Sequence, residues 1–255
     1  MLILVIGDII GKPGRRAVSE LLPGLREEHR LNLIIANAEN IAGGLGTTSA
    51  TAKELLDAGV DVLTSGNHIW AHKEILPYLE GEMPLLRPLN YPPGVPGRGY
   101  LVRGQAIVVN LIGRTFMGNF DCPFRAMDKL LAELGDETPA IIVDFHAEAT
   151  SEKMALGRYL DGRVSALLGT HTHVGTIDTR ILPQGTAYVT DIGMTGPIDS
   201  IIGDDTDSVL SRFLTLIPSR LWVGKGKTMF NAVLINIDEE SRKAISIERI
   251  YREVD

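Results

Sequence analysis

Short apolar runs rich in β-branched residues alternate with helical patterns in the first part of the chain. The first run covers residues 2–6 and precedes a Gly/Pro turn and a stretch with apolar positions at helical spacing. Further strands are expected at residues 31–36 and 60–64, with a helix at residues 49–58 between them. Alternating strands and helices of this length predict an α/β fold with a largely parallel, buried sheet.

The second part of the chain continues the pattern after a Pro- and Gly-rich segment. Residues 83–103 predict a long loop with short strands rather than a linker between domains. Beyond it we expect strands at residues 106–111, 140–145 and 164–168, helices at residues 127–134 and 153–160, and antiparallel strands at residues 186–190, 231–237 and 243–250. An α/β chain of 255 residues often forms one large core, so residues 1–255 are predicted to be a single domain.

Polar residues follow five of the predicted strands directly. In an open α/β sheet the loops at the carboxyl ends of the strands meet in one crevice, so residues far apart in sequence become neighbours. The polar groups are Asp8, Glu39 with Asn40, Asn67 with His68, His146, and His171 with His173. This repetition is the strongest functional signal in the chain.

Metal ions are the simplest explanation of so many polar groups in one crevice. Carboxylates, amides and imidazoles buried there without partners would cost several kcal/mol each. About seven oxygen and nitrogen donors exceed one tetrahedral site and suit two ions bridged by a carboxylate, roughly 3.5 to 4 Å apart. Glu39 is the candidate bridge. Imidazole-rich sites favour Fe, Mn, Zn or Co over Mg or Ca.

Each residue alone also has an ordinary structural interpretation. An aspartate after a strand, such as Asp8, is usually a cap or turn residue. His171 and His173 are a stronger signal, because alternate residues of an extended segment project to the same face. His29 lies among charged residues at a helix end and is expected to be solvated, and His72 suits a capping or surface role. The metal prediction therefore depends on the whole set.

Composition and charge restrict the location and the partners. The formal charge of −7 argues against a broad nucleic-acid-binding face and is compatible with a small phosphate substrate. Cys122 is the single cysteine, so the fold does not depend on an internal disulfide, and we expect a cytoplasmic location. Asp8 interrupts the apolar N-terminal run, which has no basic residues before it, so neither a signal peptide nor a membrane span is predicted there.

The polar groups and their neighbours resemble, in order and spacing, the sequence blocks of calcineurin-like metallophosphoesterases. The family usually has Asp-x-His in its first block and Gly-Asp in its second, whereas Ile10 and Glu39-Asn40 stand here. Both departures match the bacterial YmdB-like branch, which residues 7–15, 37–40 and 191–197 also resemble. The matching blocks are Gly7-Asp8, Ala38-Glu39-Asn40, Gly66-Asn67-His68, His146 and Gly169-Thr170-His171-Thr172-His173.

The resemblance implies a metallophosphoesterase-like αββα sandwich of two mixed sheets flanked by helices. It also implies a phosphodiesterase that hydrolyses small phosphodiesters, above all 2′,3′-cyclic nucleotides, with RNA ends as a further candidate substrate. Its cofactors would be two divalent or trivalent transition-metal ions, with Fe or Mn ahead of Zn. We expect a homo-oligomer, as is common for soluble enzymes, and no membrane partner.

The resemblance also assigns roles to single residues. Asn40 would replace the imidazole that Ile10 cannot supply. Two cations lower the pKa of a bridging water, so a metal-bridging hydroxide would attack the phosphate, and His68 would act as the general acid. One ion would be held by Asp8, Glu39, Asn40 and His173, and the other by Glu39, Asn67, His146 and His171.

Other interpretations of the same segments stay open. A regulatory or signalling platform with incidental turnover would need the metal ligands but no proton donor, so His68 distinguishes it from an enzyme. Residues 43–48 suit either a phosphate-binding loop before a helix or a flexible turn. Asp191 is a candidate partner for a ligand histidine. Activity that survives exhaustive chelation but is lost in Ser65→Ala would instead favour a serine hydrolase.

Overall fold

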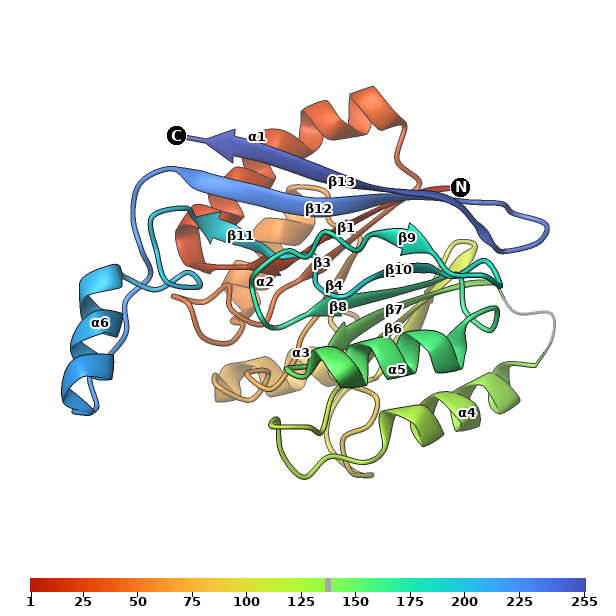
Figure 1. The fold of residues 1–255 in the computed structure, drawn as a ribbon, viewed down its shortest axis with the longest axis horizontal. Helices are drawn as coiled ribbons and strands as arrows, with labels where there is room; N and C mark the ends of the chain where they lie inside the picture. The colour runs from red at the N-terminus through yellow and green to blue at the C-terminus, as the bar shows by residue number, and fades with distance from the viewer. Residues whose placement is uncertain (136–138) are drawn as a thin grey trace.

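The computed structural model describes residues 1–135 and 139–255. Its strands form two mixed sheets that lie face to face, with helices on the outer side of each sheet (Figure 1). This arrangement confirms the predicted αββα sandwich. None of the helices in the described residues combines the length and the apolar character needed to cross a membrane.

The first sheet contains both ends of the chain. In pairing order its strands are β2 (Asp8–Ile9), β11 (Met194–Pro197), β12 (Thr228–Ile237), β1 (Leu2–Ile6), β3 (Leu33–Asn37) and β4 (Val62–Thr64), with β13 (Ala244–Val254) beside β12. β1, β3 and β4 are parallel, whereas β12 runs antiparallel to β1 and to β13. The carboxyl ends of β1, β3 and β4 therefore share one edge of the sheet.

The second sheet places further carboxyl ends together. Its strands are β5 (Tyr100–Arg103), β6 (Ala106–Ile112), β7 (Ala140–His146), β8 (Ala166–Thr170), β10 (Ala187–Val189) and β9 (Arg180–Ile181). β6, β7, β8 and β10 are parallel, and β5 and β9 pair antiparallel at the two edges. The strand expected at residues 186–190 is thus only partly antiparallel, because β10 lies inside the sheet between β8 and β9. Ile112, His146 and Thr170 are aligned by this register.

The helices form the outer layers. They are α1 (Gly11–His29), α2 (Ser49–Asp57), the short 3₁₀ helix η1 (Lys73–Ile75), α3 (Leu76–Glu80), α4 (Pro123–Leu134), α5 (Thr150–Leu160) and α6 (Thr206–Thr215). Figure 1 shows α1 outside the first sheet, α4 and α5 outside the second, and α6 projecting from the body. The Gly/Pro turn expected after β1 is instead the first turn of α1. Pro13 fits there because the first amides of a helix have no intrahelical acceptor.

The strands read as continuous apolar runs because both faces of each sheet are covered. Successive side chains of a strand point to opposite faces. Ile3 and Val5 accordingly belong to the buried cluster between the two sheets, whereas Leu4 and Ile6 belong to the cluster that includes the inner face of α1. This double layer fixes the position of the carboxyl edges on which the polar residues lie.

Candidate metal centre

The predicted site residues converge at the carboxyl edges of the two sheets. Asp8 begins β2, and His146 ends β7. The others follow β3, β4 or β8 in the chain; they are Glu39, Asn40, Asn67, His68, His171 and His173. Contacts of 3.8 Å or less between polar atoms connect the complete set. The proximity is thus observed, while the roles as ligands and acid stay predictions.

Glu39, His146 and His171 form the tightest part of the cluster. One ligand atom from each lies within 4.8 Å of the others, which is close enough for a shared metal ion. His146 Nε2 lies 3.1 Å from Glu39 Oε1 and 3.0 Å from His171 Nδ1. Asn67 Oδ1 approaches the same Nε2 atom at 3.2 Å. Four potential donors therefore meet around one buried point.

Asp8 contributes a buried negative charge. Its side chain is fully buried, and the His171 N–H donates to Oδ2 at 3.1 Å. Oδ1 has no hydrogen-bond partner among the described residues, although His173 Nε2 and His146 Nδ1 lie 3.7 and 3.8 Å away. Burial raises the pKa of Asp8 to about 6, against the attraction of both imidazoles. A cation beside Oδ1 would remove the cost of burying this charge, so the donor set fits a metal site.

The charges of Glu39 and His146 stabilise each other. Burial raises the pKa of Glu39, but His146 and His68 together outweigh burial and hold that pKa well below its usual range. Burial lowers the pKa of His146, but Glu39, Asp8 and Asp144 together outweigh it and raise that pKa to about 9. Burial and the charge of His146 lower the pKa of His171 to about 3. His171 is therefore neutral, and an ion would replace the proton between Glu39 and His146.

A hydrogen-bond chain behind His146 orients its ring. The Thr170 hydroxyl donates to Asp144 Oδ1 at 2.7 Å, so it accepts from His146 Nδ1–H at 3.1 Å. This fixes Nε2 toward the cluster, as in carboxylate-supported metal ligands. The Asn37 amide also donates to the buried Asp144 carboxylate, at 3.1 Å. The sequence reasoning missed these supports; the signal for Asp144 was a charged residue two positions before His146, on the same face of an otherwise apolar strand.

His171 and His173 lie in a turn and not in the expected extended segment. Their φ angles are 98° and 66°, in the left-handed region that side chains other than glycine rarely adopt. Asp191 holds the residue between them, because it accepts from the Thr172 N–H at 3.2 Å and from its hydroxyl at 2.7 Å. Lys153 Nζ donates to Asp191 at 2.7 Å, and both side chains are buried. Asp191 therefore supports the turn through Thr172, and its side chain is not bonded to a ligand imidazole as the sequence predicts.

His173 and Asn40 face Asp8 from the other side of the cluster. The Ile202 carbonyl can only accept, so His173 Nδ1–H donates to it at 2.6 Å and leaves Nε2 toward Asp8. The Asn40 amide is satisfied when its nitrogen donates to the Gly44 carbonyl at 3.2 Å and to His68 Nδ1 at 2.8 Å. Its oxygen then faces His173 Nε2 at 3.2 Å. This orientation suits Asn40 as an oxygen ligand beside Asp8.

The polar cluster restricts which residue can stand just before Asn67. A Cβ atom at Gly66 would strike the His146 ring and Glu39 Oε2, which explains a glycine at this position. Ser65 is buried, and its hydroxyl donates to the Leu86 carbonyl at 2.6 Å. The serine-hydrolase interpretation therefore lacks an accessible nucleophile.

A cavity of about 730 Å³ opens directly onto the cluster. Glu39, Asn40, His68, His171 and His173 line it together with the Gly-rich loop and Glu148, whose carboxylate lies 3.0 Å from His171 Nε2. Two cationic side chains, from Arg212 and Arg220, also line it. The cavity is large enough for a mononucleotide and is lined by both predicted metal ligands and cationic side chains.

Residues 43–45 of the Gly-rich loop line this cavity, and phosphate binding at the helix end that follows stays a prediction. Thr48 and Thr51 close a reciprocal capping box on α2, so these amides already have partners. His72 Nε2 approaches the Leu45 carbonyl at 2.9 Å and braces the loop. His29 contacts Glu28 at 3.4 Å at the end of α1, outside the cluster.

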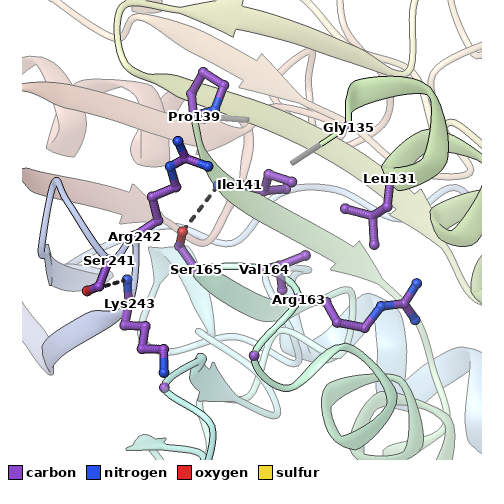
Figure 2. Close-up of a pocket in the computed structure, with 12 residues that line it drawn as sticks. Leu131, Gly135, Pro139, Ile141, Arg163, Val164, Ser165, Ser241, Arg242 and Lys243 are labelled. Carbon is purple, nitrogen blue, oxygen red and sulfur yellow. Dashed lines mark hydrogen bonds between the residues drawn. The ribbon is translucent and has the colours of Figure 1, made fainter. Parts of the chain in front are cut away.

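A different cavity lies at the amino ends of β7 and β8. It measures about 340 Å³, and Figure 2 shows Ile141 and Ser165 beside each other in it, joined by a hydrogen bond of 3.2 Å. Arg163, Arg242 and Lys243 supply its charged lining, and no carboxylate or imidazole is among its described lining residues. The metal-ligating chemistry is therefore concentrated at the carboxyl edge.

Comparison with known proteins assigns the chain to a family. The model of the YmdB-like protein family matches residues 4–250. The chain belongs to this family. A Bacillus subtilis protein named 2′,3′-cyclic-nucleotide 2′-phosphodiesterase is 49% identical to this YmdB-like chain, over 98% of this chain and 96% of its own. The predicted resemblance to the YmdB-like branch is confirmed.

Two crystal structures share the complete YmdB-like fold. A hypothetical protein from Thermus thermophilus has a TM-score of 0.93 and 47% identity over 99% of both chains. A novel phosphatase from Mycoplasma pneumoniae also has a TM-score of 0.93, with 33% identity over 99% of this chain and 93% of its own. The overall fold is therefore common to the three chains.

Proposed function

We propose that this YmdB-like protein is a dinuclear-metal phosphodiesterase of small phosphodiesters, with 2′,3′-cyclic nucleotides as its main substrates. The observation that carries the proposal is the buried, partnerless Oδ1 atom of Asp8 among imidazole and amide donors, at the base of a nucleotide-sized cavity. The name of the Bacillus subtilis relative supports the same reaction.

The predicted ligand set would hold two ions. One ion would be held by Asp8, Asn40 and His173 and the other by Asn67, His146 and His171, with Glu39 available to both. Imidazole-rich donors favour Fe or Mn, with Zn as a further candidate. When bound, two such ions supply an activated water and offset the negative charge of the phosphate.

His68 is the proposed proton donor. Its Nδ1 atom lies 2.8 Å from the Asn40 amide and 3.3 Å from Glu39 Oε1, and its side chain is 34% exposed on the cavity. Proton transfer would start from the imidazolium, whose Nδ1–H would face Glu39 Oε1 and whose Nε2–H would carry the donated proton. During hydrolysis a water oxygen bonds to phosphorus and the bond from phosphorus to O2′ breaks. The O2′ leaving group takes the His68 proton, and a 3′-phosphate remains.

The cavity walls orient the rest of the substrate. Arg212 and Arg220 can pair with phosphate oxygens, as arginine commonly does. The Arg220 guanidinium lies over the Trp222 ring at 4.2 Å, which holds it in place. Glu148 approaches His171 Nε2 and is available to a ribose hydroxyl.

Replacing His68 by alanine tests the proposal. The variant should retain both metal ions and lose roughly 10²- to 10⁴-fold in turnover of a 2′,3′-cyclic nucleotide, because a general acid contributes that much. Metal content and kcat are measured on the same samples. His29→Ala, at the end of α1, is the matched control and should keep wild-type turnover. Undiminished kcat in the His68 variant would contradict its assignment as the acid.

We further propose a single domain of residues 1–255 that acts in the cytoplasm as a homo-oligomer. The free Cys122 is compatible with a reducing compartment. α6 and the segment after it expose large apolar side chains, which a second copy would cover; they are Phe213, Leu214, Leu216 and Ile217. Light scattering of the intact protein measures the oligomeric state directly.

A further inference from the structure

Another cavity, of about 640 Å³, lies beside the metal centre at the carboxyl end of β6. The Gly113 N–H donates to the His146 carbonyl at 2.9 Å, so the segment that follows β6 starts next to a predicted ligand. This segment and the beginning of α4 form one side of the cavity, and the loop before β5 forms the other. Nothing in the proposed reaction uses this space.

The segment after β6 is held in a defined shape. The Asn90 side chain bonds the Ile112 N–H at 2.9 Å and donates to the carbonyls of Ile112 and Asp121, both at 2.8 Å. It therefore ties together the two ends of the segment. Glu152 accepts from the Arg114 and Thr115 N–H groups, both at 3.0 Å. The cavity wall is thus preorganised, which lowers the entropic cost of binding a ligand.

Aromatic rings lead from the proposed acid to this cavity. Trp70 lies two residues after His68, and its ring meets that of Tyr91 edge to face with centroids 5.4 Å apart. Tyr91 meets Phe120 in the same way at 5.1 Å, and both line the cavity. Burial raises the pKa of Tyr91, against the effect of its hydrogen bond with Trp70.

Cationic side chains line the same cavity as the two aromatic rings. Arg87, Arg114, Arg125 and Lys129 line the cavity, against the carboxylates of Asp121 and Glu133. Glu133 already contacts Lys129 at 3.9 Å. Arg114 and Arg125 are exposed, so their guanidinium groups can reach a ligand. A local excess of positive charge in a chain of net charge −7 indicates an anionic ligand.

Half-buried Arg87 also lines the cavity. Its Nη1 atom donates to the Pro88 carbonyl at 2.8 Å, whereas Nε is buried and has no partner among the described residues. Burial lowers the pKa of this guanidinium. Aromatic faces next to guanidinium donors are the combination that binds a base and a phosphate of single-stranded nucleic acid.

We propose that this cavity is a subsite for the nucleotide that precedes the cyclic phosphate of a short RNA strand. Its base would stack on Phe120 and Tyr91, and its phosphate would pair with Arg114 and Arg125. The inference rests on the proposed function and extends its substrate from mononucleotides to RNA 3′ ends. An RNA strand that ends in a cyclic phosphate continues only on the 5′ side of that group. The rings of Trp70, Tyr91 and Phe120 would guide the strand on this side. The contact is local, so it does not require a broad basic face.

The experiment compares a mononucleotide 2′,3′-cyclic phosphate with an RNA trinucleotide that ends in the same group. The metal-loaded wild-type protein should have a higher kcat/KM for the trinucleotide. Phe120→Ala should lower the ratio of the two kcat/KM values about tenfold, as expected for the loss of one stacked base. Phe120→Tyr keeps an aromatic face and should keep the ratio. Arg103→Ala, exposed on β5 and outside this cavity, is the control for a lost arginine.

A binding measurement separates this inference from the proposed function. Fluorescence anisotropy of a labelled trinucleotide 3′-phosphate reports the subsite without turnover. Arg125→Ala should weaken binding and reduce the slope of log K against log salt by about 0.7, as expected for one lost phosphate contact with a single strand. A wild-type ratio near one, or affinity unchanged in the Phe120→Ala and Arg125→Ala variants, would overturn the subsite. Failure of the mononucleotide reaction alone would overturn only the proposed function.

Discussion

Asp8 is the residue at which stability and function are most directly opposed. Ordinary cores avoid an unpaired charge, yet Asp8 is fully buried and its Oδ1 atom lacks a partner among the described residues. Such a group destabilises the fold unless a cation is bound, so its presence is explained by the site and not by packing. Asn40 similarly places an amide where its oxygen faces His173.

Asp8→Asn should separate these two effects. In the metal-free protein the variant removes a buried charge but keeps an acceptor for the His171 N–H, so the free energy of unfolding should rise by about 1 to 2 kcal/mol at neutral pH. The same variant should lose most of its metal affinity. Urea denaturation with and without metal measures both. Asp57→Asn, at an exposed ion pair with Lys53, should change stability by less than about 0.5 kcal/mol. A destabilised metal-free Asp8 variant would contradict the interpretation.

Asn40→Ala tests whether Asn40 is a metal ligand in place of the histidine that the family usually has at position 10. We expect the variant to bind one ion per chain in place of two, because its oxygen is the donor next to Asp8 and His173. Elemental analysis after dialysis counts the ions. Asn236→Ala is a suitable control, since Asn236 pairs with Leu2 at the opposite end of β1. Full occupancy of both positions in Asn40→Ala would remove it from the ligand set.

At the scale of elements, α5 holds the turn after β8. Lys153 on α5 and Asp191 form a buried ion pair of 2.7 Å, and Asp191 in turn binds the backbone and hydroxyl of Thr172. The strained φ angles of His171 and His173 persist because this surrounding structure fixes them. The position of two predicted ligands therefore depends on a helix outside the site.

Lys153→Met should lower the free energy of unfolding by about 3 to 5 kcal/mol, because it leaves the Asp191 carboxylate buried without its counter-charge. Metal affinity should fall as well, since the turn loosens. Adding Asp191→Asn should restore part of the stability by removing the remaining charge. Lys129→Met breaks an exposed pair with Glu133 on α4 and should cost less than about 1 kcal/mol. Equal losses in the two lysine variants would show that the buried pair has no special role.

The sequence predicted the longer apolar strands and missed the short buried strands β2 and β11 as well as α6. β1, β6 and β7 are continuous apolar runs, so the sequence predicts them as buried strands. α6 exposes most of its apolar side chains and lacks the usual core-facing stripe, so no helix was expected there. The turn at His171 and His173 was also missed, because its positive φ angles depend on Asp191, which is distant in sequence.

At the scale of the whole molecule, the site exists only where the edges of the two sheets meet. Asp8 and Glu39 come from the first sheet and His146 and His171 from the second, so the unfolded chain has no preformed site. The residues could be named from the sequence because each follows an apolar strand. Their contacts could not, and neither could the supporting Asp144 chain, since these depend on how the sheets pack.

The most direct test is a titration of the metal-free protein with Mn²⁺ or Fe²⁺, in which bound metal and hydrolysis of a 2′,3′-cyclic nucleotide are measured on the same samples. Turnover should be absent after exhaustive chelation and should rise until two ions per chain are bound. The melting temperature should rise with metal, because an ion that binds only the folded state at about 100 times its Kd adds about 2.7 kcal/mol of stability. Full turnover in the chelated protein would contradict the dinuclear metal centre.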